Sequence, residues 1–402
     1  METEPVVAIT PLGPVSGAAF APHRDDVVVP LERVGMAPAA ANLLSQSRRS
    51  LTTPDGSAKL ALSDAAKSSH NAARLGGCRR AGQCVANCLH AEGRPPARPP
   101  LPNPNGYDDF LKAATLLTGD VYELSTLNHD GLRALVATNA ETLRLLKLGL
   151  TRNCSVPTDS AMANVPGMMS DLAHLKSLAR LLTDEGQLAE TENRYADAAH
   201  SYLDAIRFGN EMSRGGFIIN RLVGVSCEAI GGSPLAKLVP ILKPDEARAV
   251  ITALEKVDSA RVTWEEVRRN ENRFSRYQLR KGYNLITWAT TRWPRWRSLQ
   301  RAAARHKRII AHERLLTAEL ALRCYQSEQG RAPTGLAQLV LQYLQRVPSD
   351  PFSGRPVIYR PQGTNWLLYS VGEDGVDDGG QRVGRPVSGA VTRGDLFYDS
   401  PY

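Results

Sequence analysis

Apolar residues recur at three- and four-residue steps between Tyr107 and about Gln329, a spacing that predicts α-helices. A helix is expected after Asn128, a residue type that favours N-cap positions. Its apolar stripe consists of Leu132, Leu135, Val136, Leu143, Leu146 and Leu150. Further helices are predicted around residues 172–182, 195–205, 244–258 and 298–329. Strand-like alternation is absent until after Pro356, so the pattern predicts a mainly α, antiparallel helical array.

The most apolar stretch runs from residue 216 to residue 242, and it does not have the pattern of a membrane span. It carries Arg221, Glu228 and Lys237, and a Gly-Gly-Ser-Pro sequence at residues 231–234 interrupts it. We therefore expect a buried helix pair here. The chain has no run of 18 apolar residues, and its first residues lack the basic and apolar regions of a secretory signal. These features predict a soluble chain without a transmembrane span.

One helical hairpin resembles a tetratricopeptide repeat, in which small residues let two antiparallel helices approach and an aromatic residue fills the gap. Gly186 stands at the small position of the first helix, and Ala198, Tyr202 and Ala205 match the second. Leu182 and Ala189 replace the usual aromatic residues, and the match covers about one repeat. We expect this hairpin to serve as scaffold.

The pattern changes after residue 330. A short amphipathic helix is predicted over residues 336–344, and strands are predicted near 357–360, 365–371 and 395–398. A loop rich in glycine and aspartate, residues 372–380, comes after the second strand. The sequence therefore predicts a helical domain over residues 105–296 and a small α+β module over residues 297–402, which includes the helix 298–329.

Two motifs of this module resemble the C-terminal half of the major pseudopilin, protein G, of type II secretion systems. The Asp-Pro-aromatic-x-Gly-x-Pro turn is matched by Asp350, Pro351, Phe352, Gly354 and Pro356. The Ser-x-Gly-x-Asp-Gly loop is matched by Ser370, Gly372, Asp374 and Gly375, and the match extends beyond that loop to Gly379, Gly380 and Asp395. Residues 103–402 as a whole also resemble a class of bacterial proteins that pair a helical body with this tail.

The resemblance implies a calcium site, because that loop holds calcium in pseudopilins. Calcium takes six to eight oxygen ligands, and Asp374, Asp377, Asp378 and Asp395 are the candidates to supply several of them. A glycine-rich turn with solvated acids is the alternative. The bacterial class further implies a membrane anchor where residues 1–100 stand, and hence a place in the cell envelope. This sequence has no apolar segment there.

The first quarter of the chain has a different composition. Of the 24 aromatic residues only Phe20 precedes Tyr107, whereas half of the 26 prolines lie in residues 1–104. Such a segment buries too little apolar area to offset the entropy of ordering, so we expect disorder over residues 1–104. Within it, Cys78, Cys84, Cys88 and His90 have ligand types that suit zinc, but their spacing favours a chance cluster of thiols.

Charge is concentrated in one segment. The formal net charge is +8, yet residues 268–308 alone hold thirteen basic residues and one acid, Glu271. Basic and aromatic side chains interleave over residues 264–308, and the candidate binding face comprises Arg268, Arg269, Arg273, Arg276, Arg280, Trp288, Trp293 and Trp296. Such a face suits nucleic acid, an anionic membrane surface or an acidic protein partner. The alternative is a solvated helix face with core aromatics.

No motif of an enzyme is found: the sequence lacks a Walker A loop, a zincin helix and a Gly-x-Ser-x-Gly elbow. The apolar content of 42% and the charged content of 22% exclude collagen-like, coiled-coil-only and wholly disordered chains. The sequence therefore favours a non-enzymatic interaction or structural protein with a pseudopilin-like module. The competing interpretation is a binder of nucleic acid or an anionic surface through residues 264–308.

Overall fold

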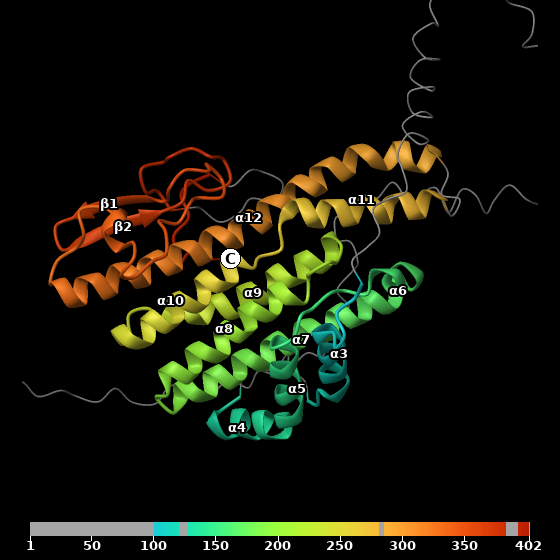
Figure 1. The fold of residues 1–402 in the computed structure, drawn as a ribbon, viewed down its shortest axis with the longest axis horizontal. Coiled ribbons are helices and arrows are strands. Elements are labelled where there is room, and N and C mark those ends of the chain that lie inside the picture. The colour runs from blue at the N-terminus through green and yellow to red at the C-terminus, as the bar shows by residue number, and fades with distance from the viewer. Residues whose placement is uncertain (1–99, 120–126, 281–284, 383–392, 402) are drawn as a thin grey trace, which may run out of the picture. The chain divides into compact units, whose positions relative to one another are not determined.

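The computed structural model describes residues 100–119, 127–280, 285–382 and 393–401, and it describes no side chain from residue 278 to residue 297. The predicted disordered segment and its cysteine cluster thus lie outside the described residues, apart from residues 100–104. Within the described residues the chain is mainly helical, with a small antiparallel sheet near its C-terminal end (Figure 1). The predicted helical array and the position of the sheet are confirmed.

In the part of the chain that the structure describes, the first helices are four short ones: α3 (Gly106–Leu116), α4 (His129–Thr138), α5 (Ala140–Leu150) and α6 (Thr158–Ala163). Asn128 caps α4 as predicted, because its side chain accepts a hydrogen bond from the backbone N–H of Gly131 at 2.9 Å. The predicted single helix from residue 132 to residue 150 is wrong, since it is broken at Asn139. The Asn139 side chain accepts from the N–H of Thr118 at 3.0 Å and donates to the carbonyl of Leu135 at 3.0 Å.

Three longer helices form the centre of the molecule: α7 (Val165–Thr191), α8 (Tyr195–Glu211) and α9 (Ile218–Leu238). α8 packs against both α7 and α9. At the first of these contacts Gly186 lies beneath the ring of Tyr202, where a Cβ atom would come within 2.3 Å of Cε1. That close approach is the one the hairpin pattern predicted, while its assignment to a tetratricopeptide repeat stays a prediction.

The expected break within residues 216–242 is absent, because α9 continues through Pro234 to Leu238. A Cβ atom at Gly231 would lie 2.5 Å from the carbonyl oxygen of Tyr202. The glycine is therefore needed for the close approach of α8, and it does not end the helix. None of the helices in the described residues is long and apolar enough to cross a membrane.

The last helices are α10 (Pro244–Ser259), α11 (Trp264–Arg280), α12 (Leu285–Gln329) and the short 3-10 helix η3 (Leu336–Leu339). α12 is 45 residues long, and α10 and α11 both pack against it (Figure 1). It begins twelve residues before the predicted domain boundary at residue 297 and so continues across it.

The sheet consists of β1 (Ile358–Gln362) and β2 (Asn365–Tyr369), which pair antiparallel with Ile358 opposite Tyr369. The predicted third strand is present as single bridges, Ser370 to Leu396 and Arg382 to Asp395. The sheet lies beside the C-terminal half of α12 (Figure 1), where the indole N–H of Trp366 donates to the Glu319 carboxylate at 2.8 Å.

Two hydrophobic clusters fill the described part of the chain. One joins α3, α5 and α7 to one face of α8, with Phe110 and Phe208 in edge-to-face contact at 4.9 Å between ring centres. The other joins α8, α9, α10 and α12 to the C-terminal module, where Leu339 and Leu396 are fully buried. The module therefore shares a core with the helical body.

Candidate functional site

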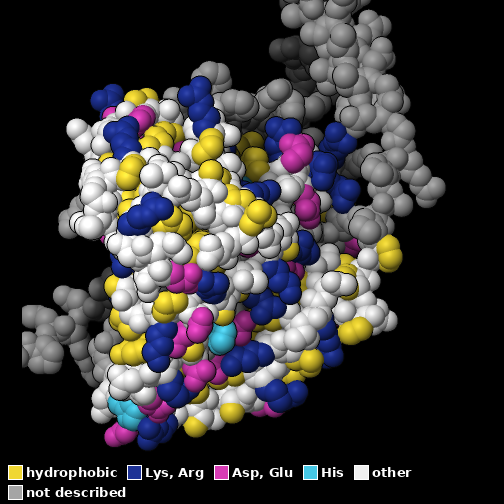
Figure 2. Space-filling model, turned by 60° about the vertical axis from the view of Figure 1, so that its left-hand side comes forward, with side chains coloured by type: hydrophobic (Ala, Val, Ile, Leu, Met, Phe, Trp, Pro, Cys, Tyr) yellow, Lys and Arg dark blue, Asp and Glu magenta, His cyan; other side chains and the backbone are white. Residues whose placement is uncertain are grey.

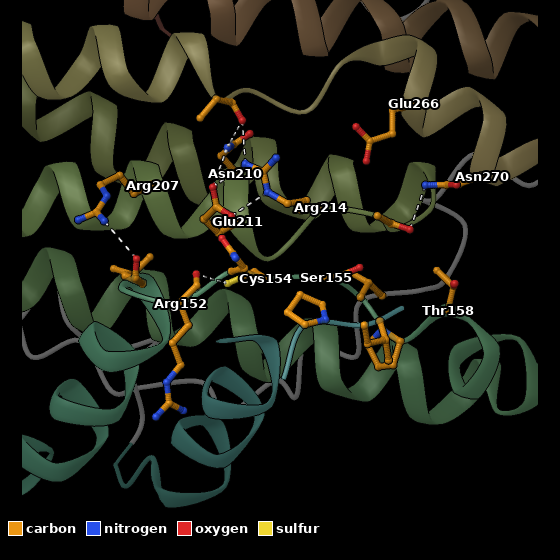
Figure 3. A pocket seen from close by; sticks show the side chains of 18 of the residues that line it. Arg152, Cys154, Ser155, Thr158, Arg207, Asn210, Glu211, Arg214, Glu266 and Asn270 are labelled. Carbon is orange, nitrogen blue, oxygen red and sulfur yellow. Dashed lines mark hydrogen bonds and ion pairs between the residues drawn. The ribbon is translucent and has the colours of Figure 1, made fainter. Parts of the chain in front are cut away.

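A cleft of about 1390 Å³ lies where several chain segments meet (Figure 3). Its wall is formed by residues 100–102, 150–160, 207–215, 253–260 and 266–273. These segments include the start of the described chain, the connection from α5 to α6, and the C-terminal ends of α8 and α10. The first half of α11 closes the remaining side.

Hydrogen bonds hold the connection between α5 and α6 in place. The Asn105 side chain donates to the carbonyl of Ser155 at 2.9 Å and accepts from its N–H at 3.0 Å. The backbone N–H of Val156 donates to the carbonyl of Arg214 at 2.9 Å. The loop is thus fastened to the N-cap of α3 on one side and to the end of α8 on the other, which gives the cleft a fixed floor.

Polar side chains at the end of α8 hold the opposite wall (Figure 3). Asn210 accepts from the N–H of Val262 at 3.0 Å and donates to the carbonyl of Ala260 at 3.3 Å. Arg214 donates to that same carbonyl at 2.7 Å and forms a two-pronged ion pair with Glu211 at 2.7 and 2.8 Å. On α11, the Asn270 amide donates to the carbonyl of Gly215 at 2.9 Å. The connection from α10 to α11 is therefore fixed by side-chain contacts.

The lining of the cleft has a net positive charge. Its basic residues are Arg152, Arg207, Arg214, Lys256, Arg269 and Arg273, and its acidic residues are Asp159, Glu211 and Glu266. Arg152, Arg207 and Arg214 are held by ion pairs with acids on neighbouring turns or helices. Lys256 and Arg269 are exposed and have no ion-pair or hydrogen-bond partner within the described residues. These two cations are available to an anionic ligand.

The predicted basic face is only partly brought together. Arg269 and Arg273 line the cleft, whereas Arg268 pairs with Glu265 at 3.3 Å outside it. Arg276 is exposed, and its side chain is not free, because it already has an interaction partner in the chain. The remaining residues lie where side chains are not described: Arg280, Trp288, Trp293 and Trp296. On the face in Figure 2, basic side chains are dispersed among acidic ones.

Four of the cleft's cations were not among the predicted residues: Arg152, Arg207, Arg214 and Lys256. Each stands near the end of a helix or in a loop, with no run of like charge around it. They reach the cleft because the segments that carry them fold together. A local search for charge runs therefore detects the α11 arginines alone.

The four predicted calcium ligands lie in and near the loop after β2, and their oxygens are largely engaged by the chain itself. Asp377 accepts from the hydroxyl of Tyr369 at 2.7 Å and pairs with Arg360 at 2.8 Å. Asp395 is buried and accepts from the N–H of Gly380 at 2.7 Å. Asp374 accepts from the backbone N–H of Val376 at 3.2 Å. The Oδ2 atom of Asp378 is buried without a partner in the described residues. Within the part that the structure describes, no three His, Cys, Asp or Glu side chains gather as metal ligands.

The turn at residues 350–356 is organised by Asp350, which is 1% exposed. Its carboxylate accepts from the N–H of Phe352 at 2.8 Å and from the N–H of Val371 at 2.9 Å. The first of these bonds closes the turn, and the second fastens it to the end of β2. Asp350 therefore stabilises the module.

A buried ion network lies between α9, α12 and the connection from α10 to α11. Arg221 and Glu228 of α9 are fully buried and paired, and Arg261 pairs with both Glu228 and Glu313. Burial opposes ionisation of Glu228, but the two arginines outweigh it and lower its pKa. Burial lowers the pKa of His306 to about 3, so its neutral ring accepts the Nε–H of Arg221 at 2.9 Å.

Glu313 belongs to the same network, but its pKa is raised whereas that of Glu228 is lowered. Burial raises its pKa to about 8 although Arg261 lies against it. Its Oε2 accepts from Arg261, while its Oε1 is buried without a partner within the described residues. The sequence pattern contains no sign of this group, since a glutamate on a helix next to arginines is typical of a surface ion pair.

No protein-family model, curated protein or solved structure matches this chain.

Proposed function

We propose that this chain is an interaction protein that binds an acidic polypeptide segment in the cleft between α5, α8, α10 and α11. The observation that carries the proposal is the lining of the cleft, in which Lys256 and Arg269 add positive charge that no described acid neutralises. Because both are exposed and line a concave surface, they can contact carboxylates without the cost of breaking existing ion pairs.

The lining favours a polypeptide over a nucleic acid. It contains polar side chains suited to a peptide backbone, such as Asn153, Ser155 and Ser160, together with the apolar Leu101 and Val156. Among the residues that line it there is no aromatic side chain on which a base could stack. Nucleic acid binding through residues 264–308 would need the tryptophans of α12, whose side chains are not described, and it is therefore an outcome of the test.

The test compares labelled ligands of equal length by fluorescence anisotropy. We expect an oligoglutamate peptide to bind, an oligoglutamine peptide not to bind, and the affinity for oligoglutamate to fall as salt rises. Arg269→Glu and Lys256→Glu should each weaken binding about tenfold, as expected for a change of about 1.4 kcal/mol in a charge contact. Arg268→Glu is the matched control, because the Arg268 side chain lies outside the cleft and pairs with Glu265.

Equal effects of the variants at residues 268 and 269, or no binding of oligoglutamate at all, would remove the cleft as a binding site. A single-stranded oligonucleotide that binds more tightly than oligoglutamate, with the same dependence on Arg269, would replace the polypeptide by nucleic acid. Binding to anionic vesicles in place of both would assign the cations to a membrane surface.

The pseudopilin-like module is proposed as a second interaction element that binds calcium in the loop after β2. One observation favours a cation there, namely the buried Asp378 Oδ2 without a partner in the described residues. We expect calcium to raise the midpoint of thermal unfolding of the full chain, and Asp378→Asn to abolish the rise. Asp374→Asn would test a second acid of the same loop. A midpoint that does not respond to calcium leaves the loop as a glycine-rich turn with solvated acids.

A further inference from the structure

The cleft between α5, α8, α10 and α11 has two sides of different origin. The first, which we call the loop side, is formed by residues 100–102 and 150–160. The second, which we call the helix side, is formed by residues 207–215, 253–260 and 266–273. In Figure 3, Ser155 and Thr158 lie on the loop side, and Glu266 and Asn270 lie across from them on the helix side. A ligand in the cleft therefore meets both sides at once.

The positive charge of the lining lies on the helix side. This side carries five basic and two acidic residues, and two of the basic ones, Lys256 and Arg269, have no partner within the described residues. The loop side carries one arginine and one aspartate, and its Arg152 is already paired with Asp109 at 2.6 Å. The carboxylates of a bound segment are therefore attracted to the helix side.

The loop side is instead rich in apolar side chains. Pro100, Leu101, Pro102 and Pro157 line it, and Leu101 is 50% exposed. Because proline has no backbone N–H, its positions present an apolar ring without a hydrogen-bond donor. The apolar residues of the helix side are smaller, namely Ala253, Val257 and Ala260. The apolar side chains of a bound segment are therefore favoured against the loop side.

Two polar side chains of the loop side can pair with a peptide backbone. Asn153 and Ser160 line the cleft and are exposed, and neither side chain has a hydrogen-bond partner within the described residues. An extended segment has backbone N–H and C=O groups free for such bonds, whereas a helix uses its own internally. The lining therefore favours an extended ligand over a helical one.

We propose that the occupant of the cleft is an extended polypeptide segment in which acidic and apolar residues alternate. Successive side chains of an extended chain point to opposite faces, so the acidic residues meet the helix side and the apolar residues between them meet the loop side. A shift of one residue exchanges the two faces, so the pattern also sets the register of the bound segment. We thereby specify the acidic segment of the proposed function, on which this assignment rests.

The experiment follows the binding of labelled octapeptides to the full chain by fluorescence anisotropy. Each peptide holds glutamate and valine in equal number. The first alternates the two residues, the second groups them in two blocks, and the third repeats Glu-Glu-Val-Val, the spacing of an amphipathic helix. Because composition and net charge are equal, the peptides differ only in the order of their residues. We expect the alternating peptide to bind about tenfold more tightly than either of the others.

Leu101→Gln tests the contact with the loop side. It should weaken binding of the alternating peptide about fivefold, because part of one leucine contact is lost, and should leave binding of oligoglutamate unchanged. A general defect of the fold would weaken both. Leu116→Gln is the matched control, because Leu116 is 46% exposed and lies outside the cleft.

Equal affinities of the octapeptides, or tightest binding of the block peptide, would overturn the alternating pattern and leave the acidic cleft standing. Tightest binding of the Glu-Glu-Val-Val repeat would replace the extended segment by a helix. Equal effects of Leu101→Gln and Leu116→Gln on the alternating peptide would remove the loop side from the contact. Failure of oligoglutamate and of every octapeptide to bind would remove the proposed function itself, and the pattern with it.

Discussion

At the scale of single residues, three buried acids of this chain have opposite fates because their surroundings differ. Glu228 faces two arginines and stays ionised, whereas Glu313 shares one of them and is held protonated by burial. Asp184 resembles Glu313, since burial raises its pKa to about 7 despite Arg180. Glu228 and Glu313 therefore differ in the number of arginines that hydrogen-bond to each carboxylate, two for Glu228 and one for Glu313.

The Glu313 carboxyl predicts a dependence of stability on pH. Its pKa is about 8 in the folded chain and near 4.5 when unfolded, so the folded chain holds a proton that the unfolded chain has released. Between these values the wild-type free energy of unfolding should lose a contribution as the pH rises, and the loss should level off above pH 8. Glu313→Gln removes that loss.

The measurement is urea unfolding of the wild type and of Glu313→Gln across this pH range. The free energy of unfolding of the variant minus that of the wild type should rise with pH. Glu265→Gln, at an exposed ion pair, should show a flat difference. A difference for Glu313→Gln that is constant or falls with pH would contradict the assigned ionisation.

At the scale of elements, the sequence predicted what local patterns control and missed what distant contacts control. The cap at Asn128 and the start of α10 at Pro244 can be predicted from residue types at the helix ends. The break at Asn139 is made with Thr118, a residue 21 positions away, so a local pattern could not show it. In the cleft, likewise, the α11 arginines form a visible charge run, while Lys256 reaches it only through folding.

The glycine contacts between helices yield a prediction at this scale. A Cβ atom at Gly231 would meet the carbonyl of Tyr202 at 2.5 Å and Cβ of Ala205 at 2.9 Å, and neither can move without shifting α8. Gly231→Ala should therefore destabilise the fold by about 1–3 kcal/mol, less the roughly 1 kcal/mol gained in helix propensity.

The control for this substitution is Gly335→Ala. No atom lies within 4 Å of a Cβ at Gly335, and its φ of −171° is extended backbone open to any residue. Urea unfolding should show this variant near wild-type stability. Equal stability of the two variants would mean that α8 and α9 can separate at no cost.

At the scale of the whole molecule, α12 runs across residue 297, where the sequence predicted the boundary between the helical body and the C-terminal module. Its C-terminal half packs both against α10 and against the sheet, and Arg308 on it pairs with Glu373 of the module at 3.0 Å. The core that results is continuous between body and module. The sequence could not show this continuity, because the change of pattern after residue 330 marks the end of a helix and carries no information about shared packing.

A shared core predicts that the helical body and the module unfold together. Leu339 of η3 is 0% exposed, so Leu339→Ala should cost about 2–5 kcal/mol through the cavity it leaves. Leu341, two residues on, is 94% exposed, and Leu341→Ala should change stability by less than about 0.5 kcal/mol. Calorimetry of the full chain should show one cooperative transition for residues 100–401, and Leu339→Ala should shift the whole transition to lower temperature. Circular dichroism should show the same shift in the loss of far-ultraviolet ellipticity from the helices. Two transitions, of which Leu339→Ala moves only the smaller, would mean that the module folds independently of the body.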